Sequence, residues 1–237
     1  MNKQDFKRGL LHGVPIFLGY LAVSFSFGIF AIASGLSVLE TILISMFNLT
    51  SAGQLAGVPI IAGAGSLFEL AIGQLVINLR YSLMSVSLSQ KFDKGVRLFD
   101  RFVVAFANTD EVFAVSSSQP SAVSKSYMYG LILPPYFGWT LGTAVGAIMG
   151  SVLSPIVMDA LSVAIYGMFI AIVVPVMRGH RATALCVLFA VALSCLFYYT
   201  PVLNTVSSGF VIIICAVVAS AVFALLAPIP VEKEGEK

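Results

Sequence analysis

The chain has 237 residues, of which 59% are hydrophobic and only 10% are charged, and its formal net charge is +2. A soluble globular domain is about 25% charged, so this composition excludes a water-soluble surface. No basic stripe with interleaved aromatic residues is present, which argues against a nucleic-acid partner. The composition predicts an all-α polytopic protein of the cell membrane, surrounded by the lipid bilayer. We expect one integral membrane domain at 13–227, with a cytoplasmic start at 1–12 and a cytoplasmic tail at 228–237.

The sequence offers no motif for metal, cofactor or enzyme chemistry. Cys186, Cys195 and Cys215 lie in apolar runs and are best explained as small hydrophobic residues inside helices. They have no C-x-x-C spacing and no clustered histidines, so neither a metal site nor a disulfide framework is predicted. The G-x-S-x-G and H-E-x-x-H motifs of hydrolases are also missing from the sequence. We therefore expect no cofactor and no enzyme activity.

The first apolar run follows a basic start. Lys3, Lys7 and Arg8 precede it, a pattern shared with secretory signal peptides. The run continues to about residue 33, which is long for a signal peptide, and many more hydrophobic segments follow. We therefore expect an uncleaved spanning helix at 13–34, with a surface of small residues that lets another helix approach closely.

Residues 36–64 are apolar but interrupted by polar and small residues. We expect one short helical piece at 41–47 and another at 51–61, the second capped from within the polar stretch that separates them. A discontinuous helix places free N–H groups and a positive dipole end inside the membrane, where they can hold a carboxylate. The alternative is a continuous helix whose hydroxyl and amide side chains bond to their own backbone carbonyls.

A third apolar segment, 66–90, carries Glu69, Asn78 and Arg80 and is long enough to cross a bilayer, which takes about 20 residues. Arg80 would lie near mid-membrane, where a charge costs about 2.5–3.5 kcal/mol. Such a residue must face the protein interior and have a partner, so Arg80 is a candidate for a functional site. Glu69 falls on nearly the same helical face. The alternative is a buried ion pair that only locks helices together.

Charge placement indicates how these segments cross the membrane. Residues 91–101 form a short basic loop, which the positive-inside rule places in the cytoplasm. If the N-terminus is cytoplasmic and both 13–34 and 66–90 span, the broken segment at 36–64 must be re-entrant. The alternative, a broken segment that spans fully, would put the basic loop outside the cell.

Residues 102–118 form an apolar run that carries Asn108, Thr109, Asp110 and Glu111. We expect a second re-entrant or short helix here. The alternative is an interfacial amphipathic helix with its acids in water. A carboxylate inside the membrane would be a candidate for carrying a coupling proton or binding an ammonium group.

Four further spanning helices fit the rest of the chain, at 126–153, 155–177, 182–200 and 206–226. The first carries a glycine at every fourth position from 138 to 150, which forms a ribbon for close helix contact. In all we expect about six spanning helices and two broken or re-entrant segments, with up to eight crossings if the latter span. Segments 13–64 and 126–177 have similar patterns, which makes them candidates for an inverted repeat.

Four short motifs follow one another along the chain: Phe47-Asn48-Leu49-Thr50-Ser51-Ala52-Gly53-Gln54, Asn78-Leu79-Arg80-Tyr81, Thr109-Asp110-Glu111, and Trp139 with Gly142-Thr143. In this order they resemble the AzlC family, the large subunits of two-component branched-chain amino acid exporters (LIV-E type). The resemblance implies export of leucine, isoleucine, valine or analogues, with methionine as a further candidate, driven by the proton gradient. It also implies a small membrane partner of the AzlD type. The chain has no P-loop, G-x-x-x-x-G-K-[ST], so no ATPase coupling is expected.

A zwitterionic amino acid needs both of its charges matched inside the membrane. Our hypothesis is that Arg80 and the helix N-terminus at 50–53 bind the carboxylate, while Asp110 or Glu111 binds the ammonium group or carries the proton. An apolar slot for the side chain is expected from Phe47, Leu55 and Leu79. The candidate substrate-binding residues are Arg80, Asn78, Asn48, Thr50, Ser51, Gln54 and Tyr81, and the candidate proton-coupling or ammonium-binding residues are Asp110, Glu111, Asp159 and Glu69. Two other classes stay open: a channel or permease for another small solute, and a non-transporting membrane subunit.

Overall fold

The computed structural model describes residues 2–154, 156, 170, 173–174 and 177–227. Regular structure in these residues is helical, apart from one isolated bridge between Phe92 and Val123. The helices in chain order are α1 (Lys3–Ala33), α2 (Val38–Phe47), α3 (Ser51–Ala62), α4 (Leu67–Gln90), α5 (Leu98–Phe106), α6 (Asp110–Ser117), α7 (Lys125–Val152), α9 (Arg181–Tyr199), η1 (Leu203–Thr205) and α10 (Ser208–Leu226).

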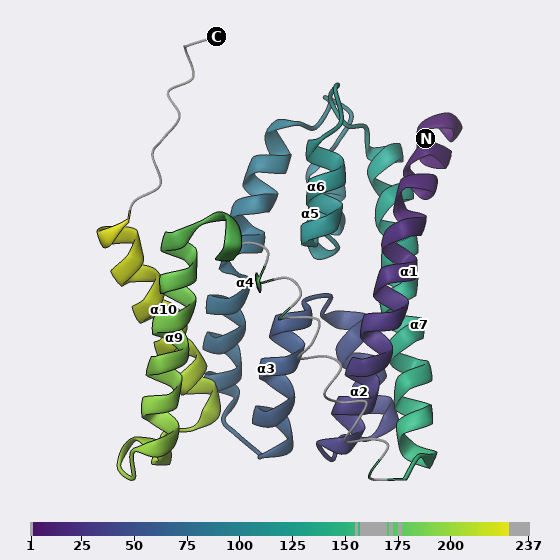
Figure 1. Ribbon diagram of the computed structural model, residues 1–237. Helices are drawn as coiled ribbons and strands as arrows, with labels where there is room; N and C mark the ends of the chain where they lie inside the picture. The colour runs from purple at the N-terminus through teal and green to yellow at the C-terminus, as the bar shows by residue number, and fades with distance from the viewer. Residues whose placement is uncertain (1, 155, 157–169, 171–172, 175–176, 228–237) are drawn as a thin grey trace.

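Several helices run the full height of the molecule (Figure 1). Among the described residues, α1, α7, α9 and α10 are long and apolar enough to cross a membrane. Helix α4 has 24 residues, which at 1.5 Å per residue is about 36 Å, but its polar residues lower its hydropathy. The prediction of an all-α polytopic membrane protein is confirmed. The predicted span at 155–177 falls mostly outside the described residues.

The break predicted within 36–64 is present. Asn48 has φ −141° and ψ 104°, an extended conformation that ends α2. Ser37 and Glu40 form a capping box at the start of α2, and Thr50 is the N-cap of α3. In Figure 1, α2 and α3 run in opposite directions and turn back near the middle of the molecule. They therefore form a hairpin of two short helices, called hairpin 1 below, and the continuous-helix alternative is wrong.

A second hairpin, hairpin 2, enters from the opposite end and consists of α5 and α6 (Figure 1). The segment predicted at 102–118 is thus two helices, separated at 107–109, and α5 begins inside the predicted basic loop. Its early start is explained by Asp100, whose carboxylate accepts hydrogen bonds from the Arg97 N–H (2.9 Å) and the Tyr129 hydroxyl (2.7 Å).

The two hairpins belong to two units that run in opposite directions. Helix α1 followed by hairpin 1 is oriented opposite to α4 followed by hairpin 2 (Figure 1). Tyr20 and Ser24 on α1 have the same spacing as Tyr81 and Ser85 on α4, and the second helix of each hairpin has a threonine N-cap, Thr50 or Thr109. The repeat expected between 13–64 and 126–177 can be followed only through α7, because most of 155–176 lies outside the described residues.

Helices α1 and α7 pack closely along their length. A Cβ added at Gly9, Gly130 or Gly146 would collide with the backbone of the facing helix. The two small-residue surfaces predicted from the sequence therefore contact each other, as in other glycine-mediated helix pairs. Gly19 is the exception, since a Cβ there would meet nothing within 4 Å.

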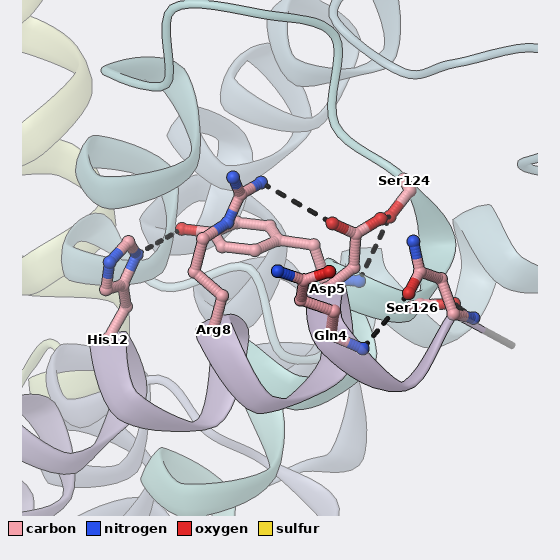
Figure 2. Close-up of polar contacts among 8 residues, drawn as sticks. Gln4, Asp5, Arg8, His12, Ser124 and Ser126 are labelled. Atoms are coloured by element: carbon pink, nitrogen blue, oxygen red, sulfur yellow. Dashed lines mark hydrogen bonds and ion pairs between the residues drawn. The ribbon is translucent and has the colours of Figure 1, made fainter.

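The basic start predicted at 1–12 is helical, so α1 begins ten residues earlier than the expected 13–34 span. Figure 2 shows the contacts that order it against the start of α7. The Asn2 N–H donates to Ser126 Oγ (2.9 Å), and Ser124 Oγ donates to Asp5 Oδ2 (2.8 Å). One turn further, His12 Nδ1 lies 2.8 Å from the hydroxyl of the buried Tyr127. These tertiary contacts explain the extension, which hydropathy alone does not predict.

Candidate functional site

Hairpin 1 is held in shape by Gln54, whose side chain is 1% exposed. Its Nε2 donates to the carbonyl oxygen of Asn48 (2.6 Å) and to Ser45 Oγ (3.1 Å). Its Oε1 accepts a hydrogen bond from Trp139 Nε1 on α7 (3.1 Å). Gln54 was predicted to contact substrate, but in the structure its amide is occupied by hydrogen bonds within the protein. It positions the hairpin.

A second amide, Gln74 on α4, joins α4 to the turn of hairpin 1. Gln74 Nε2 donates to the Gly53 carbonyl oxygen (2.7 Å), while its Oε1 accepts from Asn78 Nδ2 (3.1 Å) and Asn48 Nδ2 (3.3 Å). Asn48 Oδ1 in turn accepts from the Thr50 hydroxyl (2.8 Å). The predicted residues Asn48, Thr50 and Asn78 are thus brought together in one network at the centre of the molecule.

A central cavity of about 630 Å³ lies beside this network. Its volume is within the range of about 300–1,000 Å³ that is common for small-molecule sites. The apolar part of its lining comes from Ile16, Val23, Leu49, Ile77 and Trp139. Of the residues expected to form the apolar slot, Phe47, Leu55 and Leu79, none lines the central cavity, and Phe47 lines a neighbouring one.

The described lining of the cavity contains one ion pair and one further carboxylate that is bonded to a tyrosine. Arg80 Nη2 lies 2.8 Å from Asp110 Oδ2, and the Arg80 guanidinium lies 4.9 Å from the centre of the Tyr81 ring. The side chains of Arg80 and Asp110 are 54% and 46% exposed, so both remain accessible from the cavity. Glu111 accepts a hydrogen bond from the Tyr20 hydroxyl. A solute in the cavity can therefore meet charges of both signs.

The starts of α3 and α6 also border the cavity. Ser51 and Ala52 in the first turn of α3 line it, and that turn contains no acidic residue. The first turn of α6, in contrast, contains Asp110 and Glu111. The first N–H groups of a helix carry a positive dipole end. The start of α3 is thus free to attract an anion, whereas the positive end of α6 is matched by its own carboxylates.

The remaining candidates lie elsewhere. Glu69 is buried at the other end of α4, where its carboxylate accepts from Ser207 Oγ (2.5 Å) and the Gly209 N–H (3.0 Å) and so caps α10. Asp159 is outside the described residues. Sequence reasoning did not single out Tyr20, although a tyrosine in an apolar helix was an available signal. In the described part of the chain, no cluster of three His, Cys, Asp or Glu side chains could hold a metal ion.

Comparison with known proteins identifies the family. Residues 15–153 match the family described as "AzlC protein". The chain belongs to the AzlC family. The matched region begins within α1 and extends through α7, so it includes both hairpins and the Arg80–Asp110 pair. The family resemblance drawn from the four motifs is confirmed.

Relatives of the AzlC family member described here come from archaea and bacteria. A membrane protein of Archaeoglobus fulgidus is 33% identical over 181 residues, which is 76% of this chain and 79% of the relative. The inner membrane protein YgaZ of Escherichia coli is 29% identical over 62% of this chain and 61% of its own length. The branched-chain amino acid transport protein AzlC of Bacillus subtilis is 25% identical over 64% of this chain and 62% of its own length.

The matched region thus spans less than two thirds of the Escherichia coli and Bacillus subtilis proteins. No solved structure matches the chain. The relatives are named as membrane proteins, and the fold has several apolar helices of spanning length, so this AzlC family member is a membrane protein.

Proposed function

We propose that this chain is the large subunit of an exporter of branched-chain amino acids, driven by the proton gradient and working with a small AzlD-type subunit. The observation that carries this proposal is the central cavity, in which apolar walls surround an accessible pair of opposite charges. The name of the Bacillus subtilis relative supports the substrate class. Leucine, isoleucine and valine, with methionine as a further candidate, match the cavity because each combines a zwitterion with an apolar side chain.

In this proposal the substrate inserts between Arg80 and Asp110. The carboxylate binds Arg80 and the start of α3 at Ser51, and the ammonium group binds Asp110. The Arg80–Asp110 ion pair is then replaced by two ion pairs, one from Arg80 to the substrate carboxylate and one from Asp110 to the substrate ammonium group. The net charge of the cavity does not change, and each buried charge keeps a partner of opposite sign. The side chain then packs against Leu49 and Trp139, which line the cavity.

Proton coupling is assigned to the same carboxylates. Protonation of Asp110 would remove its attraction for an ammonium group and release Arg80, so proton and substrate would compete for one site. Such competition is the simplest basis for exchanging an inward proton for an outward amino acid. Glu111, which is hydrogen bonded to Tyr20, is the second candidate proton carrier.

The proposed orientation places both termini in the cytoplasm. Most of the described lysines and arginines belong to segments at one end of the molecule: the starts of α1, α5 and α7 and the loop before α5 (Figure 1). Basic segments are retained on the cytoplasmic side of a membrane. That end is therefore assigned to the cytoplasm, and hairpin 1 enters the membrane from the outside.

The proposal is tested by efflux of labelled leucine from preloaded cells of a strain that lacks its own exporters. We expect efflux when this chain and a small subunit are co-expressed, and a fall in efflux when the proton gradient is collapsed. The matched control is Arg80→Ala at equal membrane abundance, which is expected to abolish the efflux. An efflux rate that does not change when the proton gradient is collapsed would favour a channel. Absence of efflux for every branched-chain amino acid would refute the substrate class.

A further inference from the structure

A second cavity of about 300 Å³ adjoins the central one. The two cavities share Leu49, Tyr81 and Thr109 in their linings, but otherwise use different faces of the hairpins. The second cavity is lined by the ends of α2 and α5 and by one face of α4. Because it lies between the tips of both hairpins, anything that binds there connects the two units.

Buried oxygen atoms without partners gather around this second cavity. Asn78 Oδ1 and Asn108 Oδ1 are buried and have no hydrogen-bond partner, and Thr109 Oγ1 has none of normal length and angle although it lies near the Tyr20 hydroxyl. All three residues line the cavity. Asn108 is only 2% exposed and Thr109 only 4%. Among the described residues the same is true of one other buried side-chain atom, Thr140 Oγ1, which does not line this cavity. Buried polar atoms are normally paired, so this clustering indicates a missing occupant.

In both asparagines the amide nitrogen has a hydrogen-bond partner and the amide oxygen has none. Asn78 Nδ2 donates to Gln74 Oε1 and Asn108 Nδ2 donates to Ser85 Oγ, each at 3.1 Å. In hairpin 1, the equivalent turn satisfies its own asparagine, since Asn48 Oδ1 accepts from Thr50. In the turn of hairpin 2, Asn108 Oδ1 and Thr109 Oγ1 have no such partner within the turn. The turn of hairpin 2 therefore has oxygen atoms available for a ligand, and the turn of hairpin 1 does not.

The electrostatics of the cavity favour a cation. The last turns of α2 and α5 line it at Phe47 and Phe106, and a helix C-terminus carries a negative dipole end. Half-helix C-termini and neutral oxygens are the groups that hold Na⁺ in transporters with broken helices. The described residues of the lining include no carboxylate, whereas divalent ions are usually held by carboxylates.

We propose that the second cavity binds a sodium ion, held by the side-chain oxygens of Asn78, Asn108 and Thr109 at the tips of the two hairpins. The site is separate from the carboxylates of the central cavity. If the proposed amino acid exporter is correct, the ion lies across Tyr81 and Thr109 from the substrate, and its presence orders the wall that both share. Sodium binding itself does not depend on that function.

The test is equilibrium binding of ²²Na⁺ to the purified full-length chain, with choline chloride holding the ionic strength constant. We expect saturable binding that excess potassium does not displace, together with a sodium-specific rise in the unfolding temperature. Asn108→Leu and Thr109→Val should each weaken binding by about tenfold, the loss typical of one good polar contact. Thr109 makes no side-chain cap bond to α6, so Thr109→Val does not uncap that helix.

Thr140→Val is the matched control, because it removes an equally unpartnered hydroxyl outside the cavity and should bind sodium normally. If Asn108→Leu does not fold, Asn108→Asp keeps an oxygen ligand and should retain or strengthen binding. Absence of saturable binding in the wild type, or equal binding in all variants, overturns the proposal. Competition by methylammonium or leucine would assign the cavity to an ammonium group and also overturn it. Arg80→Ala should still bind sodium, so the two proposals can fail separately.

Discussion

Arg80 on α4 and Asp110 in the first turn of α6 lie 2.8 Å apart on the wall of the central cavity. Both side chains are about half exposed, at 54% and 46%, although they belong to segments that lie at the centre of the molecule. A pair that only locked helices together would be expected to be covered by other side chains. Its exposure to a cavity instead makes both charges available to a solute.

Arg80→Lys is expected to lower leucine transport by about tenfold or more, even though the charge is kept. Lysine cannot form the bidentate contact with a carboxylate, and it loses the planar stacking on Tyr81. The measurement is initial efflux rate in cells, normalised to the amount of protein in the membrane. A lysine variant that transports at the wild-type rate would show that Arg80 contributes only charge.

Exchanging the two charges separates structure from transport. The double variant Arg80→Asp with Asp110→Arg keeps an ion pair between α4 and α6, so its unfolding temperature should lie closer to the wild type than those of the single variants. Transport should nevertheless be lost, because the positive charge moves away from the start of α3. Recovery of leucine efflux in the double variant would mean that the pair acts only as a structural link.

Two glycines on facing helices give opposite predictions. Gly146→Ala should destabilise the protein, since a Cβ there collides with the backbone at Phe25. Gly19 lines the central cavity and a Cβ there meets nothing within 4 Å. Gly19→Ala should therefore keep the unfolding temperature within a few degrees but reduce transport of leucine relative to valine, because the cavity becomes smaller. Equal effects on both substrates would argue against a contact between this wall and the side chain.

The parts of the site that could be predicted from the sequence are those formed by charged or polar residues within apolar segments. Arg80 and Asp110 were identifiable because charges in apolar runs need partners. The break before Ser51 was identifiable because polar and small residues interrupt a hydrophobic run. Gln54 was assigned to substrate because sequence alone cannot show that Trp139 and Ser45 already occupy its amide.

Other features depend on contacts between distant segments and could not be predicted. Glu69 shares a helical face with Arg80, yet it caps α10, which follows about 140 residues later. Hairpin 2 was predicted as one segment because residues 107–109 include no glycine or proline, the residues that most often interrupt a helix. The unpartnered oxygen of Asn108 is visible only once its neighbours are placed.

Gln54→Leu is expected to lower the free energy of unfolding by about 1–3 kcal/mol, because it leaves Trp139 Nε1 and the Asn48 carbonyl oxygen without the amide that they bond. The measurement is thermal or denaturant unfolding of the purified protein, followed by tryptophan fluorescence, since Trp139 is the single tryptophan. Leu55→Ile, a neighbouring substitution without polar contacts, is the control. Unchanged stability in Gln54→Leu would show that hairpin 1 does not depend on this network.

The proposed orientation predicts which loops an impermeant thiol reagent reaches. After the native cysteines Cys186, Cys195 and Cys215 are replaced by alanine, Lys94→Cys should react only in inside-out vesicles. Ser37 is the N-cap of α2, which begins at the opposite end of the molecule (Figure 1), so Ser37→Cys should react only in intact cells. The reversed labelling pattern would place the basic end outside and contradict the assignment of cytoplasmic termini.

Equilibrium binding of labelled leucine to the purified chain measures whether the cavity binds a zwitterion between Arg80 and Asp110. Two competitors supply the decisive comparison: leucinol, which lacks the carboxylate, and 4-methylpentanoate, which lacks the ammonium group. We predict that unlabelled leucine displaces the label, that neither analogue does so at concentrations about tenfold higher, and that Arg80→Ala abolishes binding. If leucinol competes as well as leucine, the carboxylate is not recognised and the substrate does not bind between Arg80 and Asp110.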